Sequence, residues 1–153
     1  MTFGDWRRAN VNRMVRAVYN MIQETKPEIR FGISPAGVAG TSAPSYGLPK
    51  CPAGSDWQYN TIYSDPLAWL NEKTIDYISP QVYWKIGATA DYSKIVPWWN
   101  QVCEFFDRQL FVSNSISSLS SHSTELDHEE YANEVQLNRD YSFDDAPGAL
   151  GRV

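Results

Sequence analysis

The chain has 153 residues, of which 42% are hydrophobic and 20% are charged, and its formal net charge is −5. These values are ordinary for one globular domain and argue against disorder. The sequence has no basic run and no apolar run of about 18 residues, so we expect neither a nucleic-acid partner nor a membrane span.

The first third of the chain predicts a helix, a short strand and a long loop. Apolar residues over 6–25 repeat with the 3.6-residue period of a helix, and Asp5 is the expected N-cap. Residues 29–34 (IRFGIS) are β-prone and are followed by proline. Residues 35–60 are rich in Gly, Pro and Ser, and loops this long inside compact domains are usually functional.

The remainder predicts strands that alternate with helices. The expected elements, in order, are a helix with its N-cap at Asp65, a strand over 75–84, a helix over 91–107, a strand over 110–116, a helix over 128–141 and a strand over 149–153. Such alternation implies right-handed βαβ units and a parallel sheet.

Two architectures fit this order of elements. One is roughly half of a TIM (β/α)8 barrel, and the alternative is an open four-stranded doubly wound sheet. The chain starts with a helix, stops within a strand, and contains neither GxGxxG nor GxxxxGKS, which favours the barrel. We therefore expect residues 1–153 to form a single α/β unit, a (β/α)4 half-barrel and a fragment of a longer catalytic domain.

Four strings, in chain order, are similar to one family: WRRANVNRMVRAVYNMIQETKPEIRFGISPAGV, YNTIYSDPLAWLNEKTIDYISPQVYW, LFVSNSISSL and NEVQLNRDYSFDDAPGALG. They resemble the glycosyl-hydrolase-like family 10, a bacterial family of TIM-barrel proteins. The resemblance implies hydrolysis of glycosidic bonds in a bacterial polysaccharide, such as peptidoglycan glycan strands, without a cofactor. It also implies a periplasmic, outer-membrane-anchored or extracellular location. The alternative is a non-catalytic carbohydrate-binding or structural module.

The resemblance also indicates what the chain does not carry. Family members have an acidic, aromatic string at the end of strand 4, just upstream of WRR, which is absent here. Glycoside hydrolysis usually needs two carboxyl groups, about 5 Å apart for retention or about 6.5–9.5 Å for inversion. We therefore expect the 153-residue chain alone to be inactive. The weak catalytic candidate is Asp56, an acid beside Trp57 and Tyr59 in the long loop, although a solvated surface carboxylate has the same sequence signature.

Candidate substrate-binding residues follow the expected strands, because ligands bind at the carboxyl ends of barrel strands. Trp84 could stack on a sugar ring, or it could cover the core. Gln81 and Tyr83 share one strand face by the two-residue period and could hydrogen-bond sugar hydroxyls or hold a catalytic carboxylate. The alternative for this pair is a buried polar layer.

Three further residues belong to the expected carbohydrate site. Arg7 and Arg8 oppose the helix dipole at the start of the first helix, so either a specific carboxylate or substrate partner or a solvated helix start is expected. Asn114 stands where the resemblance leads us to expect His in some relatives, and asparagine cannot shuttle a proton near pH 7. Trp57 joins the candidates as the aromatic neighbour of Asp56.

Other chemistries are not favoured. Cys51 and Cys103 lie in unlike settings, so two free thiols are expected rather than a disulfide. His122, Asp127 and His128, with the serines near them, lack a GxSxG elbow, so we do not expect a catalytic triad. His122, Glu125 and His128 lack the HExxH spacing, so we do not expect a metal site.

A half-barrel would leave two sheet edges and an inner face exposed. We therefore expect either a homodimer or a longer polypeptide that supplies the N-terminal half of the barrel. The inward-facing side chains should be drawn from three pairs, namely Phe31/Ile33, Gln81/Tyr83 and Val112/Asn114.

Overall fold

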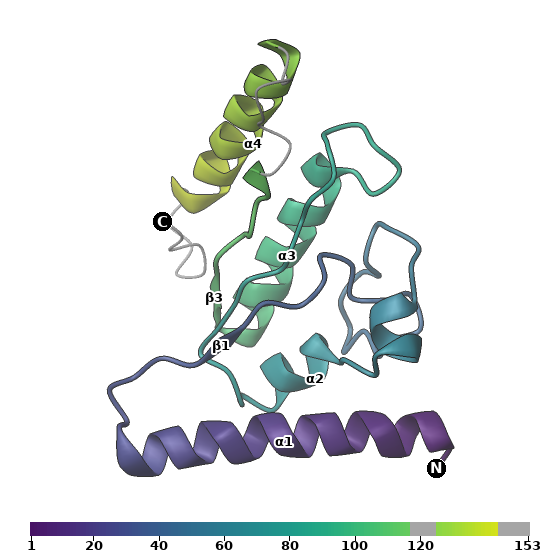
Figure 1. Cartoon of the computed structure of the whole chain (residues 1–153), viewed down its shortest axis with the longest axis vertical. Helices are drawn as coiled ribbons and strands as arrows, with labels where there is room; N and C mark the ends of the chain where they lie inside the picture. Colours follow the sequence, from purple (N-terminus) through teal and green to yellow (C-terminus); the bar gives the residue numbers. More distant parts are fainter. Residues whose placement is uncertain (117–124, 144–153) are drawn as a thin grey trace.

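A computed structural model describes residues 1–116 and 125–143 of the chain. Its elements are α1 (Phe3–Thr25), β1 (Gly32–Ile33), the π-helix η1 (Trp57–Thr61), α2 (Pro66–Asn71), β2 (Tyr77–Ile78), α3 (Tyr92–Phe106), β3 (Gln109–Leu110) and α4 (Glu125–Phe143). The three strands form one parallel sheet in the order β1-β2-β3, and Figure 1 shows α3 beside β3. The described part is therefore an α/β unit of parallel repeats. The strand expected over 149–153 lies outside the described residues.

The first helix starts three residues earlier than predicted, and Asp5 is not its N-cap. The Thr2 hydroxyl accepts a hydrogen bond from the Asp5 amide at 3.1 Å, and the Asp5 carboxylate accepts one from the Thr2 amide at 2.8 Å. This reciprocal pair is a capping box with Thr2 as N-cap. The bonds from Thr2, together with one from Arg8, lower the pKa of Asp5 to about 2.

The strands are shorter than predicted, because prolines follow two of them. Pro35 and Pro80 have no amide hydrogen, so the regular ladder stops at each. Their carbonyl oxygens still accept from the Gln81 amide at 2.9 Å and the Ser113 amide at 3.0 Å. Parallel pairing therefore continues beyond the strands as isolated bridges at Ala36, Gln81 and Ser113.

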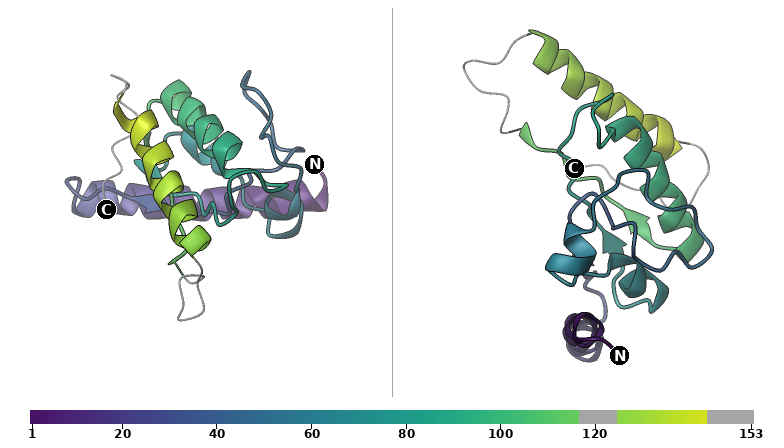
Figure 2. Two further views of the ribbon diagram at one scale, coloured as in Figure 1. Left: turned by 90° about the horizontal axis from the view of Figure 1, so that it is seen from above. Right: turned by 90° about the vertical axis from the view of Figure 1, so that its right-hand side faces the viewer.

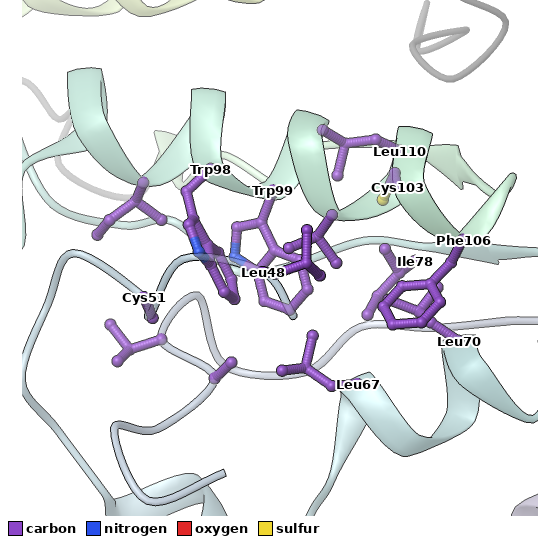
Figure 3. Packing of buried hydrophobic residues seen from close by; sticks show 14 of the residues in the cluster. Leu48, Cys51, Leu67, Leu70, Ile78, Trp98, Trp99, Cys103, Phe106 and Leu110 are labelled. Carbon is purple, nitrogen blue, oxygen red and sulfur yellow. The ribbon is translucent and has the colours of Figure 1, made fainter. Parts of the chain in front are cut away.

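One face of the sheet is buried against helices. Ile33, Ile78 and Leu110 are register partners, and the last two are at most 4% exposed. The side chains of α3 pack towards them and towards the loop after β1 and α2, as Figure 3 shows for Trp98, Trp99, Cys103, Phe106, Leu48 and Leu67. Removing this apolar surface from water, at about 25 cal/mol per Å², is the main force that stabilises the fold.

The other face of the sheet is partly exposed to solvent and differs from the predicted inward set. Of the three pairs, Gln81/Tyr83 does lie on the face away from the core. Phe31/Ile33 and Val112 pack against the core instead, and Asn114 bonds to α3 and α4. The prediction was wrong for these two pairs because a two-residue period separates the faces without saying which face the helices cover.

The remaining helices lie close to where they were predicted. Asp65 is the N-cap of α2, accepting from the Ala68 amide at 3.1 Å, which confirms that prediction. The last helix, α4, is three residues longer at its start and two at its end than predicted, and it packs on α3. Figures 1 and 2 show α1 and α4 on opposite sides of the molecule.

The structure contains the two free thiols that the sequence predicted. Cys51 and Cys103 are both buried and free, as predicted, and burial raises the pKa of each thiol.

Among residues 1–116 and 125–143, no helix has both the length and the apolar character that crossing a bilayer requires.

Candidate functional site

The carboxyl ends of the three strands converge on one polar cluster. The bridges Ala36↔Gln81 and Gln81↔Ser113 place the residues after each strand side by side. On the face away from α3, the cluster contains four residues, which are Ser34, Ser79, Gln81 and Ser113. We call Ser34, Ser79 and Ser113 the serine row.

Hydrogen bonds join the serine row across all three strands. The Oγ atoms of Ser79 and Ser113 lie 2.7 Å apart, and those of Ser34 and Ser113 lie 3.5 Å apart. The Gln81 Nε2 atom donates to the Ser34 carbonyl oxygen at 3.0 Å and lies 3.3 Å from the Ser34 hydroxyl. Gln81, predicted as a binding residue, is therefore held within an ordered polar network.

Tyr83 and Trp84 lie beside this cluster with much of their ring surface exposed. Tyr83 is 53% exposed and Trp84 is 38% exposed. The Trp84 ring lies so close to Gly37 that a Cβ there would be 2.9 Å from ring atom Cζ3 and 2.6 Å from the Gln81 carbonyl oxygen. Glycine at position 37 therefore allows the indole to settle over the loop after β1 while one part remains in solvent.

Arg7 lies among aromatic rings at the start of α1. Its guanidinium is 4.3 Å from the centroid of the Phe3 ring and 4.9 Å from that of Tyr63, and it donates to the Tyr63 hydroxyl at 2.9 Å. Phe3 stacks on Trp6, and both rings are at least half exposed. Arg7 thus holds an exposed aromatic surface against the loop after η1.

Arg8 has the carboxylate partner that the sequence left open. Its guanidinium bonds to Asp5 at 2.6 Å, donates to the Tyr59 carbonyl oxygen at 3.1 Å and covers the Tyr59 ring at 4.1 Å. Only 12% of the Arg8 side chain is exposed. Arg8 therefore fastens α1 to η1 through bonds within the chain.

Asp56, the weak catalytic candidate, is bound by its own loop. Its carboxylate accepts from the Ser42 amide at 2.8 Å, the Ser42 hydroxyl at 2.7 Å and the Thr41 hydroxyl at 3.0 Å. These bonds, led by the Ser42 amide, lower the pKa of Asp56. A general acid near neutral pH needs a raised pKa, so this environment suits a fixed anion that orders the loop. The neighbouring Trp57 is 54% exposed.

Asn114 lies between β3 and the two last helices. Its Nδ2 atom donates to the Tyr92 hydroxyl at 2.9 Å and to the Glu134 carboxylate at 2.7 Å. Burial raises the pKa of Glu134, and it raises the pKa of Tyr92 to about 12. Asn138 accepts from the Tyr92 hydroxyl at 3.0 Å, which completes a polar network that binds α3 to α4.

Sequence reasoning missed a residue that shapes the loop after β1. Gln58 is 1% exposed, and its amide accepts from the Ala36 amide at 2.6 Å and donates to the Val38 carbonyl oxygen at 3.1 Å. It thereby satisfies two backbone groups of a segment without regular structure. Nothing in the local pattern distinguishes Gln58 from an exposed glutamine.

The serine row was also missed, although the sequence contains a signal for it. The tripeptide Ile-Ser-Pro occurs twice, at 33–35 where the first predicted strand ends and at 78–80 within the second predicted strand. In a parallel sheet, equivalent positions of neighbouring strands share one face and one level. The repeat therefore indicates two adjacent hydroxyls, and the structure adds Ser113 as the third.

The amino ends of the strands form a different environment. A pocket of about 220 Å³ is lined there by Arg30, Asp76, Asp107, Arg108 and Gln109. The Asp76 carboxylate accepts from the Phe31 amide at 2.8 Å and lies 3.7 Å from Arg30. These bonds join the residues just before β1 to the residue just before β2.

The two histidine arrangements that the sequence did not favour both include His122. His122 lies outside the described residues, so the triad and the metal arrangement that include it cannot be placed. Asp127, the acid of the triad arrangement, forms an ion pair with Lys85 at 2.8 Å. That pair connects α4 to the loop after β2.

Comparison with known proteins identifies relatives over most of the chain. The model of the family described as glycosyl hydrolase-like 10 matches residues 1–127. The protein named glycosyl hydrolase YngK of Bacillus subtilis (strain 168) is 34% identical over 143 residues, which are 88% of this chain and 27% of that protein.

A second relative also matches most of this chain and only part of its own length. The protein named glycosyl hydrolase DigH of Escherichia coli (strain K12) is 33% identical over 113 residues, which are 71% of this chain and 24% of that protein. The chain therefore spans about a quarter of the length of these relatives. The extent of the family match and the order of the shared motifs lead to one conclusion: this chain belongs to the glycosyl hydrolase-like 10 family.

Proposed function

We propose that this chain binds carbohydrate at the carboxyl ends of β1, β2 and β3. The observation that supports the proposal most strongly is the cluster of Gln81, Tyr83 and Trp84 beside the serine row. Sugar sites combine aromatic surface with a few fixed hydrogen-bonding groups, and this cluster has both.

We propose further that the chain is part of a domain that hydrolyses glycosidic bonds in a bacterial polysaccharide, with peptidoglycan glycan strands as the substrate. The family resemblance supports this proposal. Trp84 would stack on a sugar ring, while Tyr83 and Gln81 would bond to its polar groups. Arg7 and Trp57 would extend the contact along a glycan chain, because their surroundings keep aromatic surface exposed.

Arg8 and Asn114 would act indirectly. Their polar atoms already bond to Asp5, Tyr59, Tyr92 and Glu134, so we propose that they hold the neighbouring loops and helices in place. The carboxyl pair that the reaction needs would come from residues of a longer polypeptide, since relatives are about four times as long as this chain. The partly exposed sheet face would be completed by further (β/α) units of that polypeptide. Light scattering of the 153-residue chain tests the alternative, because a stable dimer would favour association between copies.

The Trp84→Ala variant tests the binding proposal. Loss of one aromatic stacking partner should weaken binding of a peptidoglycan-derived glycan oligosaccharide by about 1 kcal/mol, or roughly fivefold. Isothermal titration of the wild type and the variant measures the effect, and Phe105→Ala, at an exposed position of α3, serves as the control outside the proposed site. Equal affinities of the wild type and Trp84→Ala would contradict the proposed platform.

A further inference from the structure

The orientation of the Gln81 side chain follows from its partner. The amide group of a glutamine can be reversed, which exchanges its oxygen and its nitrogen. The atom that faces the Ser34 carbonyl oxygen, at 3.0 Å, must be the nitrogen, because a backbone carbonyl oxygen only accepts hydrogen bonds. The second hydrogen of the same nitrogen points to the Ser34 hydroxyl at 3.3 Å. Both N–H groups of the Gln81 side chain therefore bond to Ser34.

The hydroxyl groups of the serine row can donate in an order that agrees with this orientation of Gln81. The Ser113 hydroxyl donates to the Ser79 carbonyl oxygen at 3.3 Å. Its oxygen can then accept from the Ser79 hydroxyl at 2.7 Å and from the Ser34 hydroxyl at 3.5 Å. Once the Ser34 hydroxyl donates to Ser113, its oxygen is left to accept from Gln81. Every hydroxyl hydrogen of the serine row thus has an acceptor. The Ser34 hydroxyl oxygen in turn accepts from the Gln81 side-chain nitrogen.

We infer that the side-chain carbonyl oxygen of Gln81 is a fixed hydrogen-bond acceptor for a donor group of the sugar, and that the serine row is its positioning device. The donor is either a ring hydroxyl or the N–H of an acetamido group, since both present one hydrogen to a carbonyl oxygen. This inference rests on the proposed carbohydrate binding. It adds that Gln81 selects sugars that present a hydrogen-bond donor at this position. Ser34, Ser79 and Ser113 are positioning residues, because they act through Gln81.

Four variants of the full 153-residue chain test the inference by isothermal titration with an N-acetylglucosamine tetramer and a glucose tetramer. Gln81→Ala should weaken binding about tenfold, and Ser113→Ala about threefold. Ser113→Thr keeps the hydroxyl and should bind within twofold of the wild type. Ser34→Ala, at an exposed position, provides a second test of the row should Ser113→Ala fail to fold.

The side-chain amide resonances of Gln81 supply a second readout, assigned through their loss in Gln81→Ala. Without ligand, they should shift in Ser113→Ala and in Ser34→Ala and return towards the wild-type position in Ser113→Thr. An effect of Gln81→Ala on both tetramers identifies a hydroxyl donor, and an effect on the N-acetylated tetramer alone identifies the acetamido N–H.

The outcomes separate this inference from the proposed function. If Trp84→Ala weakens binding while Gln81→Ala binds like the wild type, the inference is wrong and carbohydrate binding stands. If neither tetramer binds to the wild type, the proposed function fails on this chain, and the inference fails with it. Amide resonances of Gln81 that do not respond to Ser113→Ala or Ser34→Ala would remove the positioning role of the serine row.

Discussion

The two faces of the sheet are built from alternate residues of the same strands, yet they differ in almost every physical property. On the covered face, Ile78 and Val82 are at most 1% exposed beneath α3. On the opposite face, Tyr77 packs edge-on against Phe111 at 5.1 Å, and the serine row and Gln81 follow towards the carboxyl end. The covered face supplies stability, and the other face leaves the side-chain carbonyl oxygen of Gln81 and the ring of Tyr83 available to a ligand.

The comparison shows that the two-residue period of a strand places buried residues on one face of the sheet and residues open to a ligand on the other. A substitution on the covered face should lower the free energy of unfolding. A substitution on the open face should leave that free energy almost unchanged and alter binding instead. Four predictions test this division, from the largest expected effect to the smallest.

Trp99→Ala should have the largest effect. Trp99 is 0% exposed, and its indole nitrogen donates to the Gly37 carbonyl oxygen at 2.7 Å. Its removal should lower the free energy of unfolding by about 3–5 kcal/mol, because it creates a cavity and leaves a carbonyl unbonded. Urea denaturation measures the loss, with Trp99→Phe as a milder variant. A loss below about 1 kcal/mol would show that the covered face is not the stabilising one.

Gln58→Ala should come next, with a loss of about 2–4 kcal/mol. The substitution leaves the partly buried Ala36 amide and the buried Val38 carbonyl oxygen without their partner, and each unsatisfied group costs about 1–3 kcal/mol. Urea denaturation checks this value. Gln136→Ala, at an exposed position of α4, is the matched control and should change stability by less than about 0.5 kcal/mol.

Glu134→Gln tests the buried polar group at the junction of β3 and α4. Burial raises the pKa of Glu134 in the folded state, so ionisation of this carboxyl opposes folding. That penalty is absent below the ordinary pKa of a glutamate and is fully present above the raised pKa. The free energy of unfolding of Glu134→Gln, relative to the wild type, should therefore increase from pH 4 to pH 7.

Urea denaturation at several pH values measures this trend. Glu129→Gln removes an exposed carboxylate from the same helix, and as the matched control it should change stability by less than about 0.5 kcal/mol. A difference between Glu134→Gln and the wild type that stays constant or declines as pH rises would contradict the assigned cause.

Tyr83→Ala should have the smallest effect on stability, within about 0.5 kcal/mol, because more than half of its surface is already in solvent. Its effect should appear in binding of the glycan oligosaccharide, which should weaken several-fold through loss of ring contact and of the hydroxyl. Thermal denaturation and titration of the same sample measure both quantities. A large loss of stability without a change in affinity would place Tyr83 with the covered face.

Much of the fold was predictable from periodicity and from the residues that end helices. The 3.6-residue repeat predicted α1 and α3, and Asp65 before Pro66 predicted the start of α2. Strand length was not predictable in the same way, because the apolar run of the second predicted strand continues past Pro80 although the regular ladder does not. Asp5 was misassigned as a cap since a capping box uses an acidic side chain at its third helical position as well.

The site was predictable where it depends on strand ends and not where it depends on contacts between distant loops. Gln81 and Tyr83 were found because they alternate with buried residues at the end of a strand. The bonds of Asp56 to the Ser42 loop, and of Gln58 to the loop after β1, join residues 14–22 positions apart without a local pattern. Glu134 reaches Asn114 from another helix, so its burial is visible only in three dimensions.

The most direct test of carbohydrate binding at the carboxyl ends of the strands is a two-dimensional NMR titration of the 153-residue chain with the N-acetylglucosamine tetramer. Backbone amides of Ser34, Ala36, Gly37 and of residues 81–84 and 113–115 should shift together with the indole signal of Trp84, while amides of residues 98–106 should stay in place. Shifts confined to the opposite end, around Arg30, Asp76 and Arg108, or no saturable shifts at all, would contradict the account.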